Sequence, residues 1–450
     1  MRFCGIDIGT TNTKGVLMDR DFNLLGKIIL PACLPDDGYL VSCQSWCDSV
    51  GQVLDGFKCR DLIGNIKVVC GLATQGGSFV ILDRQFQPLS PGFSWLGRCS
   101  EAMVDRIRSD FGSQTFYQKT GWAPDSWLMI GKVREWMERS GVASDRVRCV
   151  STVPDYVCTQ ILGRPVTDVT NAQISGLYDI EAGRWWPEIL NWAHLKVNQM
   201  SQVVNRPEVV ADDVDISGVS VTLTTSLHDQ YAAMAACGLQ NDELMLATGS
   251  AWVINGRTSK PLFDMDRFTV HPGRDLCGGF GFITSFGGVG KDFDRLLAEL
   301  GIGYGDLDKL NCEFDKAGPP AMPSQKERSR GEMLRRHMEE LGSRVRYMLE
   351  KVGVMDGLGK LLMTGGALGS RYWPRMISNV CGVPVEGVRF DELTAYGAAR
   401  FARFAVRGDW GPDGWPKGVA VSVFEPEYRA AYDEWYVNHQ RPKLKAEDIG

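Results

Sequence analysis

The chain has 450 residues, of which 44% are hydrophobic and 23% charged, and its formal net charge is −6. This length exceeds one ordinary domain and predicts two domains of about 200 residues each. The negative charge argues against nucleic acid and against an anionic membrane surface as partners. The 13 cysteines are scattered and include no C-x-x-C pair, which argues against a zinc site and favours reduced thiols.

The N-terminal residues show no charged segment followed by an apolar one, so we expect no signal peptide. No uninterrupted apolar run reaches about 18 residues, so we expect no membrane span. Both observations, together with the reduced cysteines, predict a cytoplasmic location.

The stretch FCGIDIGTTNTKGVLMD, residues 3–19, predicts two strands, 3–8 and 15–19, joined by a turn of glycine, threonine and asparagine. It matches neither a Walker A loop nor a dinucleotide-binding loop. Such a turn presents N–H groups and hydroxyls to an anion, and glycine permits close approach. Asp7, at the end of the first strand, could hold Mg²⁺ through water, and Lys14 could neutralise phosphate charge. The alternative is an ordinary hairpin with a polar turn.

The next segments alternate between strands and helices. Residues 66–89 predict a buried strand, a glycine-rich turn and a hairpin strand. Residues 98–112 and 129–142 have the apolar spacing of helices. Residues 153–190 predict a short helix, a turn and a compact segment.

Asp229 precedes a run of small residues in TSLHDQYAAMAACG, residues 225–238. Small residues let another element pack closely against the predicted helix. From this stretch alone an N-cap is the favoured role for Asp229, with a general base as the alternative. His228 alone is more typical of a structural residue.

Residues 243–261 repeat the opening pattern of strand, small-residue turn and strand, which suggests an internal duplication, with chance similarity as the alternative. Residues 331–353 predict a long amphipathic helix, and residues 360–388 a strand, a Gly-Gly turn, a helix and a strand. A small-residue helix follows at 391–408. Strands and helices alternate in both halves, which predicts α/β layers. Three Gly/Ser/Thr turns at strand ends suggest a nucleotide held in a cleft.

Together these segments resemble the FGGY family of carbohydrate kinases, in the sugar kinase, heat-shock 70 and actin superfamily. The resemblance covers essentially the whole chain: GIDIGTTNTKGVLMD, the 153–190 stretch, HDQYAAMAACG, LATGSAWVI, TGGALGSRYWPRM and DELTAYGAARFA follow one another in the family's order. It implies an α/β fold of two ribonuclease H-like (actin-like ATPase) domains with an ATP and sugar cleft between them. Residues 1–238 would bind the sugar and carry the first phosphate hairpin, and residues 239–450 would bind ATP.

The resemblance also implies roles for individual residues. Asp229 would take the proton from the sugar hydroxyl that attacks the γ-phosphate, which reverses the N-cap interpretation, and Asp7 would order Mg²⁺ through water. Positioning and charge stabilisation of this kind are what phosphoryl transfer needs. The implied ATP-binding residues are Thr10, Thr11, Asn12, Lys14, Thr248, Gly249, Ser250, Gly287, Lys291, Gly365, Gly366 and Ser370; the implied substrate-binding residues are Gln75, Gly76, Gly77, Trp95, Trp127, Asp229 and Gln230.

Several positions depart from the family pattern. Gly76 and Gly77 stand where glycerol kinases carry an Arg-Glu pair and many xylulokinases a Met-His pair. In SWLGRCS, Trp95 and Arg98 remain from a Trp-x-Asp-x-Arg motif, but the Asp is replaced. These changes argue against glycerol, place xylulose in doubt, and favour a ketose, a deoxysugar or another polyol as acceptor.

Three other functions remain as alternatives. An ATPase that activates a radical dehydratase would share the opening hairpin but is shorter and has cluster-binding cysteines. A sugar sensor without catalysis would share the fold, and an interaction scaffold would not bind Mg·ATP. The sequence leaves the oligomeric state open, with a homodimer among the states that it allows.

Overall fold

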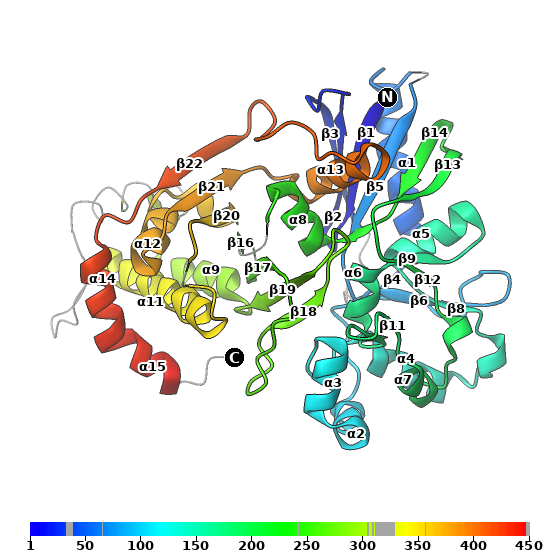
Figure 1. Ribbon diagram of the computed structural model, residues 1–450, viewed down its shortest axis with the longest axis horizontal. Coiled ribbons are helices and arrows are strands. Elements are labelled where there is room, and N and C mark those ends of the chain that lie inside the picture. Colours follow the sequence, from blue (N-terminus) through cyan, green and yellow to red (C-terminus); the bar gives the residue numbers. More distant parts are fainter. Residues whose placement is uncertain are drawn as a thin grey trace. The chain divides into compact units, whose positions relative to one another are not determined.

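The computed structural model describes residues 1–32, 39–64, 66–240, 243–249, 251–303, 306–307, 310, 329–355 and 357–446. The chain folds into two compact units, each built from a sheet and helices (Figure 1). The first unit comprises residues 1–238, 259–281 and 392–417; the second comprises residues 239–258, 282–391 and 418–450. This is the mixed α/β architecture with two sheet-containing bodies that the sequence predicted. The assignment of sugar binding to 1–238 and of ATP binding to 239–450 stays a prediction.

The central sheet of the first unit has the strand order β13-β14-β5-β1-β2-β3. The predicted opening hairpin is confirmed, because β1 and β2 pair antiparallel, although β2 begins at Asn12, three residues earlier than expected. Strands β5 and β14 extend the sheet in parallel. The strands are β1 (Arg2–Ile8), β2 (Asn12–Met18), β3 (Leu24–Pro31), β5 (Val68–Thr74), β13 (Val209–Ile216), β14 (Val219–Thr224) and, beside β5, β15 (Leu227–His228).

Helices cover both faces of this sheet. On one face, Cys4 and Ile6 of β1 share a core with Val53 of α1 (Gln44–Cys59) and with α5 (Val153–Leu162). On the other face, α13 (Leu393–Arg407) lies directly on β1: a Cβ added to Gly5 would come within 1.8 Å of the Ala395 carbonyl oxygen.

Helix α8 (Asp229–Cys237) in turn lies on α13. A Cβ at Gly397 would come within 1.8 Å of the Ala232 carbonyl oxygen. The small residues predicted to allow close packing of α8 are therefore used against α13. Asp7, like Gly5, points to the α13 face because side chains alternate along a strand.

The prediction of a hairpin at residues 66–89 is wrong. Strand β6 (Phe79–Leu82) does not pair with β5; it belongs to a four-stranded sheet with the order β4-β7-β6-β8. Both edges of β5 are already occupied by parallel neighbours, β1 on one side and β14 and β15 on the other. The glycine-rich turn therefore leads the chain out of the central sheet.

Further helices and short strands complete the first unit. The predicted helices at 98–112 and 129–142 are confirmed as α2 (Glu101–Phe111) and α4 (Met129–Ser140). The others are β4 (Leu40–Val41), β7 (Gly92–Phe93), α3 (Ser113–Thr120), β8 (Cys149–Thr152), β9 (Val166–Asp168), α6 (Val169–Ala172), β10 (Tyr178–Asp179), β11 (Arg184–Trp185), α7 (Pro187–Trp192), β12 (Gln202–Val204) and β18 (His271–Arg274).

The sheet of the second unit contains the order β19-β17-β16-β20-β21-β22. Strands β16 and β17 form an antiparallel hairpin, β20 and β21 follow in parallel, and β22 is antiparallel to β21. This sequence of directions repeats that of β2, β1, β5, β14 and β13, which supports the internal duplication suggested by residues 3–19 and 243–261. The strands are β16 (Leu244–Thr248), β17 (Trp252–Thr258), β19 (Phe280–Ser285), β20 (Leu361–Gly365), β21 (Val385–Arg389) and β22 (Ala420–Phe424).

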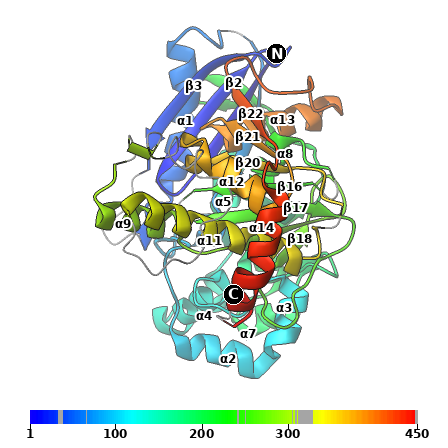
Figure 2. The ribbon, with the colours of Figure 1, turned by 90° about the vertical axis from the view of Figure 1, so that its left-hand side faces the viewer.

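Helices of the second unit include the long amphipathic helix expected at 331–353, which is confirmed as α11 (Arg330–Lys351). It contacts α9 (Val289–Leu300) and α12 (Tyr372–Cys381), and α12 also contacts α14 (Arg429–Trp435) (Figure 2). A further helix, α15 (Arg441–Ala446), ends the described chain. In the described residues no helix combines the length and apolarity that a bilayer crossing requires. The described cysteines are free thiols.

Candidate active site

Two aspartates meet at one edge of the first unit's central sheet. Strands β1 and β15 each pair in parallel with β5, with Asp7 opposite Ala73 and His228 opposite Thr74. Parallel neighbours end at the same edge of a sheet, so the end of β1 with Asp7 lies beside the start of α8 with Asp229. The sequence predicted a role for each aspartate, and the strand register is what brings them together.

The carboxyl group of Asp7 is buried at this edge, and its pKa is raised. Its Oδ1 atom is inaccessible to solvent and has no hydrogen-bond partner among the described residues. Burial, and then the neighbouring negative charge of Asp229, raise the pKa of Asp7 to about 8, while Lys14 on the paired strand opposes this rise. A carboxylate held near a like charge is stabilised by a cation.

These residues fit a magnesium ion that takes few ligands from the protein. The described chain holds no cluster of three or more His, Cys, Asp or Glu side chains suited to a metal. Mg²⁺ commonly binds through one or two carboxylates together with waters and substrate phosphates. The Oδ1 atom of Asp7, which has no partner among the described residues, could accept a hydrogen bond from a water of such a hydrated ion.

Asp229 is the first residue of α8 rather than its cap. The N-cap position belongs to His228, and no side chain caps the helix. The N-cap role that the stretch alone favoured is therefore not found. Instead, the Asp229 Oδ1 atom lies 3.2 Å from Nε2 of His228, whose side chain is 9% exposed. Gln230, the next residue of α8, is half-buried beside them.

A buried network fixes the backbone beside Asp229. The N–H of His228 donates to the Thr170 hydroxyl over 2.8 Å, and that hydroxyl is hydrogen-bonded to Asp168. Asp168 also accepts from the Ser226 hydroxyl and from the Asn171 amide, each over 2.7 Å. Burial raises the pKa of Asp168, although these hydrogen bonds oppose the rise. Sequence reasoning missed this network; the Thr-Asp and Asn-Ala pattern within 153–190 was the available signal.

The two glycines at 76 and 77 lie under this histidine and against two tryptophans. A Cβ at Gly76 would stand 2.6 Å from Cδ2 and 2.7 Å from Nε2 of His228. Gly77 has φ +76°, and a Cβ there would stand 3.3 Å from both Trp127 and Trp95. The structure thus brings together four predicted substrate residues and adds His228 to them.

Thr10, predicted to hold phosphate, is joined to predicted substrate residues. Its hydroxyl donates to Oε1 of Gln75 and accepts from Nε1 of Trp95, each over 2.9 Å. The next two residues of the turn, Thr11 and Asn12, bond weakly to each other over 3.4 Å. The hydroxyl of Thr10 therefore orients the Trp95 ring as well as belonging to the turn.

An aromatic wall continues from Trp127. The rings of Trp122 and Trp127 meet edge to face with centroids 5.0 Å apart, and Trp122 stacks on His271 at 4.2 Å. Burial lowers the pKa of His271 to about 4, so this ring is neutral near pH 7. Neither Trp122 nor His271 was predicted. Their stacking joins segments far apart in the sequence, since His271 comes from β18, and no local pattern indicates it.

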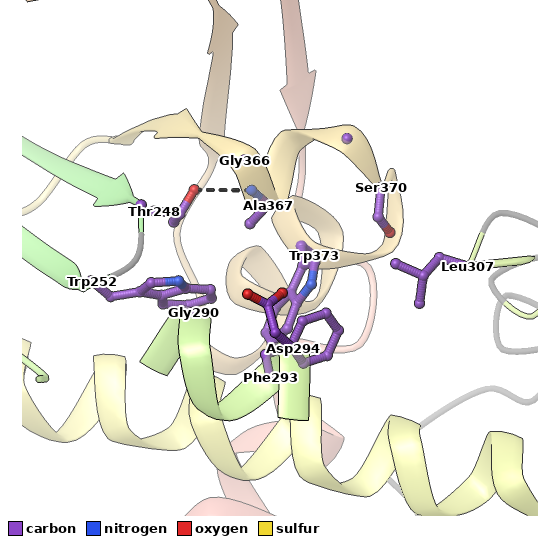
Figure 3. Close-up of a pocket in the computed structure, with 12 residues that line it drawn as sticks. Thr248, Trp252, Gly290, Phe293, Asp294, Leu307, Gly366, Ala367, Ser370 and Trp373 are labelled. Carbon is purple, nitrogen blue, oxygen red and sulfur yellow. Dashed lines mark hydrogen bonds between the residues drawn. The ribbon is translucent and has the colours of Figure 1, made fainter. Parts of the chain in front are cut away.

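The second unit contains a pocket of about 470 Å³ at the matching position of its own sheet. Thr248 ends β16 opposite Gly365 of the parallel strand β20. The Thr248 hydroxyl donates to the Thr364 carbonyl over 2.6 Å and accepts from the N–H of Ala367 over 3.2 Å. Figure 3 shows the latter bond on one side of the pocket and the rings of Trp252, Phe293 and Trp373 on the other.

Four predicted nucleotide residues line this pocket: Thr248, Gly249, Gly366 and Ser370. Gly365 adjoins it, has φ +97°, and would place a Cβ 2.6 Å from the Thr248 carbonyl oxygen. Gly287 and Lys291 are not among the lining residues; the neighbouring Gly290, Phe293 and Asp294 of α9 are. Ser250 lies outside the described residues.

The aromatic lining of the pocket was missed. Trp252 and Phe293 each meet Trp373 edge to face, at 4.9 and 5.1 Å. Trp373 falls inside the quoted TGGALGSRYWPRM segment, and the apolar spacing of GVGKDFDRLL was the available signal for Phe293.

The chain matches two family models that together cover more than half of its residues. Residues 3–234 match the family model described as the FGGY family of carbohydrate kinases, N-terminal domain, and residues 316–406 match its C-terminal domain. The chain belongs to the FGGY family of carbohydrate kinases. Members of this family are phosphotransferases with an alcohol group as acceptor, and the chain is an enzyme of that class.

Individual relatives are distant. A glycerol kinase of Thermococcus kodakarensis is 23% identical over 57% of this chain, which spans 58% of that relative's length. A glycerol kinase of Thermococcus onnurineus is 21% identical, over 89% of this chain and 88% of its own. The crystal structure of a xylulose kinase from Rhodospirillum rubrum has a TM-score of 0.85 at 20% identity, and 99% of each chain is covered. At this identity the structural likeness shows the fold alone.

Proposed function

We propose that this FGGY kinase transfers the γ-phosphate of ATP to a hydroxyl of a sugar or polyol, with Asp229 as the general base. The observation that carries the proposal is the meeting of Asp7 and Asp229 at one sheet edge. Family membership supports the reaction class, since sugar kinases of this family use ATP, typically with Mg²⁺.

In this proposal Asp229 accepts the proton of the acceptor hydroxyl as its oxygen attacks phosphorus. A base must lie within hydrogen-bond reach of the proton that it removes, so its position matters first. The Nε2 atom of His228 lies 3.2 Å from Oδ1 of this carboxylate, and the Asp168 network holds the backbone of His228 through its N–H group.

Asp7 has a separate role in the proposal, which is to hold a hydrated Mg²⁺. Such an ion supplies charge stabilisation to the phosphates. Thr11, Asn12 and Lys14, from the turn and from β2, would contact phosphate oxygens. Thr10 would contribute mainly its N–H group, because its hydroxyl is already bonded to Gln75 and Trp95.

The pocket of the second unit would receive the adenosine. Its volume of about 470 Å³ lies in the range of small-molecule sites, and Trp252, Phe293 and Trp373 offer apolar surface. Thr248 and Gly249 would contact phosphate at the turn that repeats the opening hairpin. The proposed contacts of Gly287 and Lys291 with ATP have weaker support, because neither residue lines the pocket.

The acceptor is proposed to be larger than glycerol: a ketose, a deoxysugar or another polyol. Gly76 and Gly77 offer backbone rather than charged side chains, and Trp95 and Trp127 offer ring faces to sugar C–H groups. Since matching relatives are glycerol kinases, glycerol is the acceptor to test against this proposal.

The test is ADP release from Mg·ATP, measured with a panel of ketoses, aldoses, deoxysugars and polyols that includes glycerol. Asp229→Ala is compared with Asp105→Ala, a matched change at an exposed carboxylate of α2. We expect one acceptor to raise the rate far above the background without sugar, and only Asp229→Ala to abolish that rise.

Other outcomes would overturn parts of the proposal. Glycerol as the best substrate by kcat/KM would contradict the reasoning from Gly76 and Gly77. ATP binding without stimulation by any acceptor would favour a protein-directed ATPase or a sugar sensor, and failure to bind Mg·ATP would favour a scaffold.

A further inference from the structure

A second pocket of the first unit lies away from the aspartates. It has a volume of about 620 Å³ and is formed around the parallel pair β9 and β12, with β11 and the segment that follows α7. None of the residues implicated in phosphoryl transfer lines it. Asp168 ends β9, whereas the pocket opens before the start of that strand, at Arg164 and Pro165.

Three arginines, Arg148, Arg164 and Arg184, line this pocket, and no aspartate or glutamate does. Arg148 donates to the Asn198 carbonyl over 3.2 Å, and Arg164 donates to the Val210 carbonyl over 2.7 Å. Within the described part of the chain none of the three forms an ion pair with a carboxylate. Three uncompensated positive charges in a chain of net charge −6 form a localised anion-attracting site.

The chemistry of the lining suits a phosphate ester. Guanidinium groups match phosphate oxygens with paired N–H donors, and two of these guanidiniums are already oriented by backbone carbonyls. The other walls include Pro165, Pro187 and Met200, which offer apolar surface to a carbon skeleton. The volume suits a small molecule rather than a bare ion.

We propose that this pocket binds a phosphorylated small metabolite, with its phosphate at Arg148, Arg164 and Arg184 and its carbon skeleton against the apolar wall. The site is separate from the proposed phosphoryl-transfer site and does not depend on that function. Its occupation can therefore be measured without ATP and without an acceptor sugar.

The experiment titrates the full chain with glucose 6-phosphate and, separately, with inorganic phosphate, by calorimetry at about 0.1 M salt. The variant Arg184→Glu changes an exposed arginine whose side chain makes no hydrogen bond within the described residues, so it is expected to fold. Arg164→Ala/Arg184→Ala removes two charges, and Arg20→Ala, at an arginine whose side chain is 75% exposed, is the matched control.

We expect saturable binding of glucose 6-phosphate that weakens at least tenfold in both pocket variants, is unchanged in Arg20→Ala, and falls as salt is raised. Equal affinity in the wild type and the pocket variants would overturn the assignment, as would the absence of saturable binding. Inorganic phosphate that binds as tightly as glucose 6-phosphate would overturn the role given to the apolar wall.

Discussion

Replacement of Gly76 by alanine tests how the base is held. The added Cβ would stand 2.6 Å from Cδ2 and 2.7 Å from Nε2 of His228, and 2.9 Å from Cδ1 of Ile174. These separations are shorter than van der Waals contact, and the backbone that carries the ring is held by the hydrogen bond from the N–H of His228 to Thr170. Overpacking of a buried site costs about 1–3 kcal/mol. Because the His228 ring contacts Asp229, its displacement is expected to lower kcat by about 10²-fold.

The assay pairs thermal unfolding with steady-state kinetics on the best acceptor. Gly359→Ala is the control, since a Cβ at Gly359 would meet nothing within 4 Å. In the double variant Gly76→Ala/His228→Ala the clash with the imidazole ring is removed and only the contact with Cδ1 of Ile174 at 2.9 Å remains, so the two changes should be far from additive in stability. A Gly76→Ala enzyme with wild-type stability and wild-type kcat would show that the position of the His228 ring does not depend on Gly76.

Three further predictions concern other parts of the molecule. Asp7→Asn should lower activity by about 10- to 100-fold and raise the Mg²⁺ concentration needed for half-maximal rate; an unchanged Mg²⁺ dependence would exclude Asp7 from metal binding. Gly365→Ala, at φ +97° and 2.6 Å from the Thr248 carbonyl oxygen, should weaken ADP binding by about tenfold or more in calorimetry, and unchanged affinity would separate this turn from the nucleotide. Burial lowers the pKa of Lys132 to about 7, so between about pH 7 and pH 10 the unfolded chain binds more protons and stability rises with pH. Between pH 7 and pH 9 the free energy of unfolding, measured with denaturant, should rise less for Lys132→Met than for the wild type. An equal rise in the two proteins would show that the pKa of Lys132 is not lowered by burial.

Local patterns in the sequence predicted the elements that carry the proposed chemistry. The strand–turn–strand pattern at residues 3–19 and the small residues after Asp229 gave β1, β2 and α8 close to their observed bounds. These signals are short in range, because strand alternation and helix periodicity are properties of neighbouring residues. The register that places Asp7 beside Asp229 required the pairing of β1 and β15 with β5, which no local pattern contains.

Contacts between distant segments explain what was missed. Asp168 reaches Ser226 across 58 residues of sequence, and the stacking of Trp122 on His271 spans about 150 residues. The hairpin wrongly predicted at 66–89 has the same cause, since β5 is flanked by strands from both earlier and later in the chain. The role of Gly76 also depends on a ring that lies far along the sequence.

The proposed role of Asp229 as the base is tested by the transfer of labelled γ-phosphate from Mg·ATP to the best acceptor, in the wild type and in Asp229→Asn. We expect the variant to keep its ADP affinity and its unfolding temperature, while the rate of labelling falls by about 10²- to 10⁴-fold. A labelling rate near that of the wild type would show that Asp229 is not the base.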